Sequence, residues 1–266
     1  MDLSLRSYYP ATFPTDLHRH TAEVVYNFFA FVSVVDTFLV VNSCARGKAT
    51  PESDLDFAVL ANPDTPLTEI SRLEQKWAAF SGENADIARY RNSHRFAAVH
   101  LDIIDGRYIP SAWDDGGGPD FFEVEIGNRI AYPAPLGEAG LYFQQLRTQW
   151  LPYYDEDLRL ARLAMASAAC EYDLDHIPFY VKRGLHYQAF DRLYKAFQEF
   201  LQALFIRHKT YPIAYNKWIK EQVVSMLNLP ELYVQLPPIL SVTAMESNEL
   251  NEKANALRAL LHAYCQ

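Results

Sequence analysis

Three aspartates in the first half of the sequence have the spacing and surroundings of metal ligands. Asp54 and Asp56 are two residues apart, where the apolar run 55–61 begins. Residues two apart in an extended strand point to the same face, so both carboxylates converge on one point. Adjacent ionised carboxylates repel each other, and a divalent cation with hard oxygen ligands compensates that repulsion. Asp102 lies in another apolar run, where we expect it to be buried and to share this metal.

The residues that precede the aspartate pair supply a complementary site for an anion. Asn42 and Ser43 follow a β-rich run and open a predicted short helix. Backbone N–H groups at such a helix start, with the Ser43 hydroxyl and Arg46 nearby, bind anions such as phosphate. Phosphates held beside carboxylates that bind Mg²⁺ are what phosphoryl or nucleotidyl transfer requires.

These residues resemble the nucleotidyltransferase superfamily, to which polymerase β and the aminoglycoside nucleotidyltransferases belong. The pattern of that superfamily is a hydrophobic residue, Gly, Gly or Ser, then Asp-x-Asp, with a third acidic residue downstream. The stretch NSCARG at 42–47 is similar to the GSxARG version of its small bacterial members. The family's first glycine is Asn42 here. Because Asn is the non-glycine residue most often found at positive φ, we expect the turn to be kept.

The resemblance implies a role for each of these residues. Asp54 and Asp56 would bind Mg²⁺, and Asp102 would complete a reactive site that holds two Mg²⁺ ions. Asp102 or a metal-bound hydroxide would help to deprotonate the acceptor. ATP or another nucleoside triphosphate would give its nucleoside monophosphate to the acceptor and release pyrophosphate. The turn would bind the β and γ phosphates through its backbone and through Asn42, Ser43 and Arg46.

Hydrophobic periodicity predicts the elements that position these residues. A helix with Thr15 or Asp16 as its cap is expected near 16–35, and another over 67–80. Strands are expected at 37–41, 55–61 and 96–104, with weaker ones at 121–126 and 129–132. Helical patterns dominate after Pro133 and Pro135, at 138–150, 156–172, 187–209, 212–228 and 248–264.

This order of elements predicts an α+β fold of two domains. Residues 1–135 would form a mixed-sheet nucleotidyltransferase domain that carries the catalytic residues. Residues 136–266 would form an all-helical bundle domain. The stretch HYQAFDRLYKAFQEFLQALF at 186–205 resembles the helical domain of bacterial enzymes of this kind.

The second half also contains a locally basic segment. Residues 182–220 hold eight basic residues against only Asp191 and Glu199. A nucleoside triphosphate carries about four negative charges, which metals neutralise only in part, so a cation should face it. Lys217 is the preferred candidate, since helical domains of such enzymes commonly offer a lysine to the triphosphate. Lys182 and then Lys195 follow, and a solvated helical face is the alternative.

Composition limits the partners. The 266 residues carry a formal net charge of -9, which favours a cationic acceptor and disfavours nucleic acid. A small polar, possibly aminoglycoside-like acceptor is therefore the first choice. Three widely separated cysteines suggest neither a disulfide framework nor a zinc site. Because no apolar run approaches the roughly 20 residues of a membrane span, we expect a cytoplasmic protein without a membrane partner.

Other functions remain open at this point. A nucleotidyltransferase that modifies a protein or a tRNA end, as in toxin-antitoxin systems, would share all the catalytic residues. A module that binds nucleotide without turnover is a second alternative, which Asn42 alone supports. Glu123 and Glu125 are either exposed on a strand or general bases beside Asp102. His100, two residues before Asp102, either lines the site or is a hydrogen-bonded structural histidine.

Overall fold

The computed structural model describes residues 10–111 and 116–266, which form two compact units. Within these residues, the sheet unit contains 10–108 and 125–151. The helical unit contains 109–111, 116–124 and 152–266. The fold is α+β, as the order of elements predicts. The division of the chain near residue 135 stays a prediction about independently folding domains.

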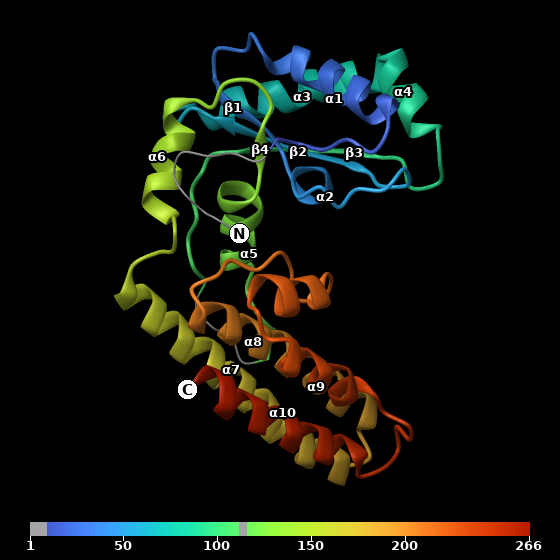
Figure 1. Ribbon diagram of the computed structural model, residues 1–266, viewed down its shortest axis with the longest axis vertical. Coiled ribbons are helices and arrows are strands. Elements are labelled where there is room, and N and C mark those ends of the chain that lie inside the picture. The colour runs from blue at the N-terminus through green and yellow to red at the C-terminus, as the bar shows by residue number, and fades with distance from the viewer. Residues whose placement is uncertain (1–9, 112–115) are drawn as a thin grey trace. The chain divides into compact units, whose positions relative to one another are not determined.

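A mixed four-stranded sheet forms the centre of the sheet unit (Figure 1). The strand order is β3-β2-β1-β4. β1 runs antiparallel to β2 and β4, whereas β2 runs parallel to β3. The strands are β1 (Val35–Val40), β2 (Leu55–Ala61), β3 (Val99–Ile104) and β4 (Ala134–Pro135).

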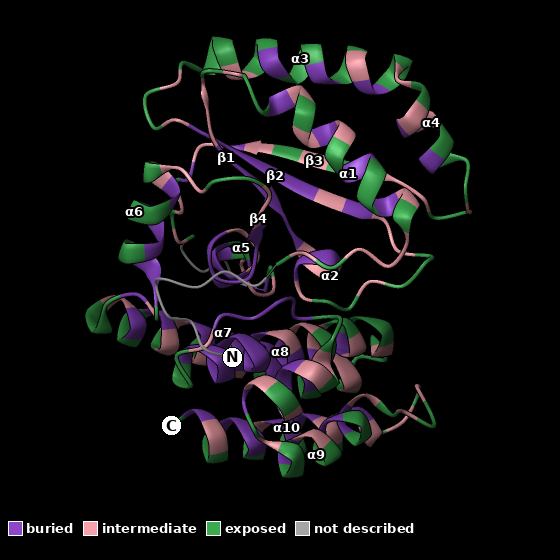
Figure 2. Ribbon diagram, turned by 45° about the horizontal axis from the view of Figure 1, so that its top comes forward, coloured by how far each residue is buried: buried purple, intermediate pink, exposed green. Residues whose placement is uncertain are grey.

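Helices cover one face of this sheet, and the short helix α2 (Asn42–Ala45) lies on the other side (Figures 1 and 2). The Thr15 hydroxyl caps the first helix by accepting a hydrogen bond from the His18 N–H. Phe29 and Trp77 from two of these helices pack against Phe57 of β2 in one apolar core. The covering helices are α1 (Asp16–Phe29), α3 (Leu67–Glu83) and α4 (Ala85–Arg91).

Asp36 joins strand β1 to helix α6 (Leu141–Trp150). Its carboxylate accepts hydrogen bonds from the backbone N–H groups of Tyr142 and Phe143, both at 3.0 Å. The Thr37 hydroxyl donates to the same carboxylate and accepts from the Gly140 N–H. Asp36 therefore satisfies N–H groups that the first turn of α6 leaves without helical partners.

Long helices form the core of the helical unit. α10 packs against both α7 and α8, and α9 packs against α10 and the π-helix η2. These elements are α7 (Glu156–Lys182), α8 (His186–Arg207), η2 (Glu221–Met226), α9 (Pro230–Leu240) and α10 (Glu249–Cys265). Among the described helices, none combines the length and the apolarity that a membrane span requires. The three cysteines are buried and free.

The strands predicted at 121–126 and 129–132 are wrong. These residues form helix α5 (Phe122–Ile126) and the π-helical turn η1 (Gly127–Ala131). The alternation of Phe122, Val124 and Ile126 with Glu123 and Glu125 is typical of a strand with one polar face. Glu123 is fully buried, since Arg162 and the Tyr154 hydroxyl bind its carboxylate at 2.8 and 2.9 Å. Because Arg162 pairs with Glu123, a charged residue is buried in α5, and the helical periodicity of the segment cannot be recognised from its apolar residues alone.

Predicted helix limits were also wrong in the second half. The helix expected at 212–228 begins only at Ile219. The buried Gln222 side chain bonds the backbone of Ile213, Ala214 and Lys217, which holds this segment outside the helix. In contrast, α7 continues past Pro178, and the proline-containing α9 was not expected. Tertiary contacts override proline signals in both helices.

Replacing Asp36 by alanine should lower the free energy of unfolding by about 1–2 kcal/mol, because the first turn of α6 loses its cap. Urea unfolding followed by circular dichroism measures this change. Asp64, an exposed aspartate in the loop before α3, serves as the matched control. Equal stabilities of the Asp36→Ala and Asp64→Ala variants would contradict the role of Asp36.

Candidate functional site

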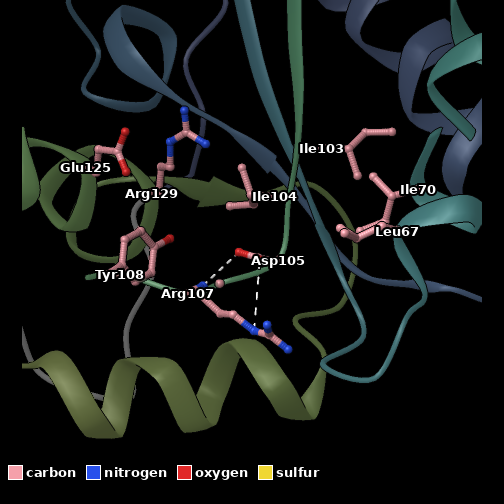
Figure 3. A pocket seen from close by; sticks show the side chains of 10 residues that line it. Leu67, Ile70, Ile103, Ile104, Asp105, Arg107, Tyr108, Glu125 and Arg129 are labelled. Carbon is pink, nitrogen blue, oxygen red and sulfur yellow. Dashed lines mark hydrogen bonds and ion pairs between the residues drawn. The ribbon is translucent and has the colours of Figure 1, made fainter.

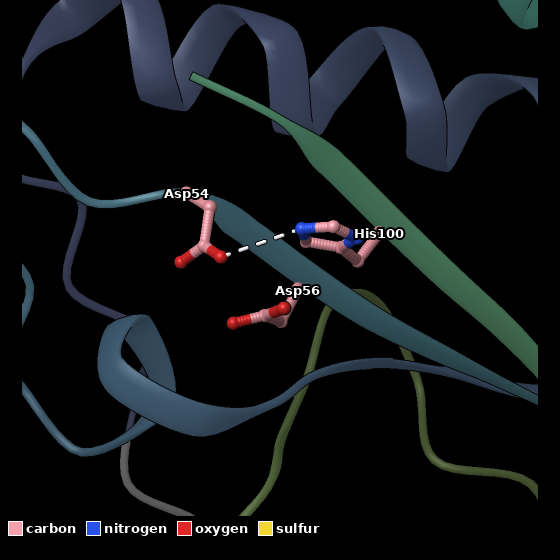
Figure 4. Close-up of side chains that lie close together, drawn as sticks. All are labelled: Asp54, Asp56 and His100. Atoms are coloured by element: carbon pink, nitrogen blue, oxygen red, sulfur yellow. Dashed lines mark ion pairs between the residues drawn. The ribbon is translucent and has the colours of Figure 1, made fainter. Parts of the chain in front are cut away.

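Asp54, Asp56 and His100 form a cluster on the sheet (Figure 4). Each contributes one ligand atom, and these atoms all lie within 4.8 Å of one another. His100 Nε2 is 3.5 Å from the Asp54 carboxylate. Figure 4 shows the three side chains directed toward a common space on the side of the sheet where α2 lies. The predicted convergence of the aspartate pair is confirmed.

The pairing of β2 with β3 produces this cluster. The register places Asp56 opposite His100 and Phe57 opposite Leu101. Phe57 and Leu101 belong to the apolar core beneath the covering helices. Because side chains alternate between the faces of a strand, Asp56 and His100 point away from that core. Burial of the apolar set therefore fixes the polar set on the open face.

Asp102 lies on the same face as His100 but outside the cluster. The prediction that it is buried is wrong, since its side chain is 69% exposed. Arg129 of η1 donates a hydrogen bond to its Oδ2 at 3.1 Å. β3 is the edge strand of the sheet, which explains why a residue inside an apolar run reaches solvent. Asp102 thus has a charged partner without a shared metal.

The turn before the carboxylates has the conformation that the sequence requires. Asn42 has φ = 55°, a left-handed conformation that favours glycine and that Asn adopts more readily than other residues. The Arg46 N–H donates to the Asn42 carbonyl, and the Lys48 N–H donates to the Ser43 carbonyl. The expectation that Asn42 keeps the turn is confirmed.

Cys44 lies beneath this turn beside both carboxylates. Burial, followed by the negative charges of Asp56 and Asp54, raises the pKa of its thiol to about 12. The thiol therefore stays protonated at neutral pH and adds no negative charge to the cluster. Its backbone carbonyl accepts a hydrogen bond from the Thr12 N–H at 2.9 Å, which fixes the turn from the N-terminal side.

Two buried side chains anchor the residue that precedes Asp54. The Tyr90 hydroxyl of α4 donates to the Ser53 carbonyl at 2.8 Å, and His18 Nε2 of α1 contacts the same oxygen at 3.1 Å. Because the Ser53 carbonyl can only accept, Nε2 carries the proton, and the Thr15 hydroxyl, 2.7 Å from His18 Nδ1, donates to that nitrogen. Burial lowers the pKa of His18, which keeps the ring neutral. Helices on the covered face thus position Asp54 on the open face.

The remaining predicted site residues lie in several places. Lys217 is exposed in the loop before η2, and Lys182 is exposed at the end of α7. Lys195 forms an ion pair with Asp191 at 2.9 Å. Glu123 is not an exposed strand residue but a buried ion-pair partner, whereas Glu125 is exposed in the sheet unit.

The sequence leaves open whether His100 lines the site, and the structure places it in the cluster, whereas Arg129 was not predicted as a site residue. The two-residue spacing of His100 and Asp102 gave a signal for the histidine. The sequence contains no such signal for Arg129, because residues 129–132 were predicted as a strand rather than as the π-helical turn η1.

The donor set of the cluster fits a divalent metal. Two carboxylates supply hard oxygen ligands of the kind that Mg²⁺ and Mn²⁺ prefer. The imidazole of His100 adds a nitrogen ligand that is more suited to Mn²⁺ than to Mg²⁺. All three side chains are at least partly exposed, which leaves room for water or substrate as further ligands. Asp54, Asp56 and His100 are therefore the residues that would hold a metal.

A comparison with protein families supports the same chemistry. The family model described as the nucleotidyltransferase domain matches residues 33–107. The matched span contains the turn at Asn42, the cluster and Asp102. These residues are similar to that family. No curated protein matches the chain. The match supports the predicted superfamily for residues 33–107, and the kind of acceptor stays a prediction.

Loss of the Tyr90 hydroxyl should weaken Mn²⁺ binding, because Ser53 loses one of the two bonds that orient Asp54. The Tyr90→Phe variant should bind Mn²⁺ roughly tenfold more weakly, as measured by electron paramagnetic resonance of the free ion. Ser93→Ala is the control, since it removes a hydroxyl that bonds the Tyr90 carbonyl instead. The same Mn²⁺ affinity in Tyr90→Phe and wild type would show that Asp54 does not need this anchor.

Single substitutions should separate His100 from Asp102. We expect His100→Ala to weaken Mn²⁺ binding by roughly tenfold, because a ligand of the cluster is lost. Asp102→Asn should change the affinity by less than about twofold, since Arg129 already engages this exposed carboxylate. The same Mn²⁺ titration measures both variants, and the reverse order of effects would move the metal toward Asp102.

Proposed function

We propose that the protein is a metal-dependent nucleotidyltransferase that moves a nucleoside monophosphate, most simply AMP from ATP, to a hydroxyl of a small polar acceptor. The observation that carries this proposal is the cluster of Asp54, Asp56 and His100 inside the matched nucleotidyltransferase domain. Nucleotidyl transfer needs carboxylates that converge beside a phosphate-binding turn, and here the turn at Asn42 and Ser43 resembles that of the nucleotidyltransferase superfamily.

The reaction follows from the chemistry of the triphosphate. The oxygen of the acceptor hydroxyl attacks the α-phosphorus and forms a new P–O bond. The bond between the α-phosphorus and the bridging oxygen breaks in line, and pyrophosphate leaves with the electron pair. We propose Asp102 as the group that takes the hydroxyl proton and as the third carboxylate of the site. This role requires Arg129 to release Oδ2 of Asp102.

The residues of the chain would bind and orient the substrates. A divalent metal at Asp54 and Asp56 would supply positive charge against the phosphate oxygens. The backbone and the hydroxyl of Ser43 would bind the β and γ phosphates, with Arg46 beside them. The left-handed Asn42 supports this role, because glycine, the family residue at this position, adopts that conformation without strain. Lys217, or Lys182 in its place, is the lysine that we propose for the triphosphate by resemblance to the family.

The net charge of -9 supports a cationic small molecule as acceptor over nucleic acid. An acceptor of the aminoglycoside kind remains part of this proposal by resemblance only. Label transferred from a nucleoside triphosphate to macromolecules in a lysate, and not to small molecules, would point to a protein or a tRNA end instead.

Calorimetric titration with each nucleoside triphosphate and Mg²⁺ tests the proposal directly. Wild-type protein should bind one nucleotide in a metal-dependent manner. The Asp54→Asn, Asp56→Asn double variant should bind it on the order of 100-fold more weakly, because the metal loses both carboxylates. Asp64→Asn is the control for a general charge effect, since Asp64 is exposed outside the cluster. Equal binding by wild type and double variant would refute the site.

The same titration also tests turnover. Pyrophosphate release in the presence of an acceptor mixture would support a transferase. Tight binding with no pyrophosphate release under any acceptor would instead favour a module that binds nucleotide without turnover.

A further inference from the structure

Arg129 bonds Asp102 on the strand face and also lines a cavity of about 250 Å³ (Figure 3). The cavity lies beyond Ile104, the last residue of β3. Arg129 belongs to η1, in the same compact unit as the sheet. It lies outside residues 33–107, which the family model matches. The family match therefore assigns no function to this arginine.

The cavity gives Arg129 space to move. Its charged lining consists of two carboxylates and two arginines, namely Asp105, Glu125, Arg107 and Arg129. Because these charges balance, the cavity does not select an ion. A long side chain with open volume beside it can change its rotamer without displacing packed neighbours. The position of Arg129 beside Asp102 is therefore one of several that its surroundings permit.

The pair of Arg129 with Asp102 is easy to open. The side chain of Asp102 is 69% exposed, and that of Arg129 is 25% exposed. An ion pair that water reaches contributes little to stability. The bond in the structure joins one nitrogen to one oxygen, whereas arginine binds carboxylates and phosphates most strongly through two parallel bonds. A stronger partner can therefore replace either member of the pair.

Asp102 is close enough to the metal-binding cluster to join it. The register places His100 beside Asp56, and Asp102 is the next residue on that face of β3. Diagonal neighbours on paired strands are within reach of each other's side chains. In the structure, Oδ2 of Asp102 is bonded to Arg129 of η1 instead. Loss of that bond leaves the carboxylate free to turn toward Asp56.

The reaction that we propose brings a phosphate within reach of Arg129. A group that takes a proton lies about 3 Å from the hydroxyl oxygen. That oxygen lies about 3–3.5 Å from the phosphorus that it attacks. The α-phosphorus therefore comes within about 6 Å of the Asp102 carboxylate. Because Oδ2 of Asp102 is 3.1 Å from a guanidinium nitrogen, a change in the torsions of Arg129 closes the remaining gap.

We propose that Arg129 binds the α-phosphate of the nucleotide through two N–H groups of its planar guanidinium, and that this contact frees Asp102 for the reaction. The inference rests on the proposed function. In the free protein, Arg129 pairs with Asp102. When nucleotide and metal bind, Asp102 turns toward Asp54 and Asp56, and Arg129 turns toward the phosphate. Each charged group keeps a partner of opposite sign in both states.

This exchange makes the order of events depend on the nucleotide. A lone pair of Oδ2 that accepts the N–H of Arg129 is not available to the hydroxyl of the acceptor. The phosphate takes that N–H and leaves Oδ2 of Asp102 open. The acceptor hydroxyl can then donate its hydrogen bond to Asp102 only where a nucleotide is already in place.

A double-mutant cycle without nucleotide tests the bond between Arg129 and Asp102. We expect Arg129→Gln to strengthen Mn²⁺ binding about fivefold, because Asp102 can then turn toward the cluster. In an Asp102→Asn background, the same substitution should change the affinity by less than about twofold. Electron paramagnetic resonance of the free ion measures all four proteins. No gain, or the same gain in both backgrounds, would overturn the exchange.

Arg107→Gln is the matched control for a loss of positive charge. Arg107 lines the same cavity and lies 3.9 Å from the Asp105 carboxylate, so it has an aspartate of its own. Its substitution should leave the Mn²⁺ affinity within about twofold of that of wild type. A gain equal to that of Arg129→Gln would assign the effect to charge alone and overturn the exchange.

Calorimetry with the preferred nucleoside triphosphate and Mg²⁺ tests the phosphate contact. Arg129→Gln should bind the nucleotide roughly tenfold more weakly than wild type, because a charge-assisted contact is lost. Arg107→Gln should bind as wild type does. Pyrophosphate, which represents the β and γ phosphates, should bind wild type and Arg129→Gln equally. A similar loss of pyrophosphate binding would overturn the assignment to the α-phosphate.

Arg129→Lys keeps the test decisive if Arg129→Gln does not fold, which circular dichroism shows. Lysine keeps the positive charge and lacks the planar fork of the guanidinium. We expect Mn²⁺ binding within about twofold of wild type and nucleotide binding about threefold or more weaker. Full nucleotide affinity in Arg129→Lys would overturn the contact through two N–H groups.

The outcomes separate this inference from the proposed function. Metal-dependent nucleotide binding that is equal in wild type and Arg129→Gln would refute the role of Arg129 and keep the function. No metal-dependent nucleotide binding by wild type would refute the function and the phosphate contact together. The Mn²⁺ cycle needs no nucleotide, so it decides in either case whether Arg129 holds Asp102 away from the cluster.

Discussion

The parallel register of β2 and β3 is the constraint on which the site depends. Leu55, Phe57 and Val59 must face the covering helices, because they form the apolar core with Phe29 and Trp77. Alternation then sends Asp56 to the opposite face, and the register places His100 directly beside it. A shift of one residue in either strand would exchange core and site positions. The energy that buries the core is thus the energy that assembles the carboxylates.

The charges on the open face are balanced locally. His100 lies beside the aspartate pair, Arg129 binds Asp102, and the thiol of Cys44 stays protonated beneath the turn. Asp54 and Asp56 carry like charges on one face of the sheet, and a divalent metal is a chemical partner that removes their repulsion. Tyr90 and His18 hold the Ser53 carbonyl from the covered side, so the position of Asp54 does not depend on that metal.

Local patterns in the sequence predicted the parts of the fold that local physics controls. The strand that starts at Leu55, the cap at Thr15 and the turn at Asn42 follow from alternation, capping and backbone preference. The strand prediction for 121–132 was wrong because the burial of Glu123 depends on Arg162, which is 39 residues away. The exposure of Asp102 depends on the place of β3 at the edge of the sheet. Neither fact is encoded within a few residues of the position it affects.

Arg129 connects the two chemical features of the sheet unit. Its guanidinium binds Asp102 on the strand face, and the same side chain lines the cavity beyond Ile104. A cation in this place prevents the charge of Asp102 from adding to that of Glu125. Because Arg129 comes from η1, in a segment that the sequence pattern predicts as a strand, its pairing with Asp102 is a property of tertiary structure.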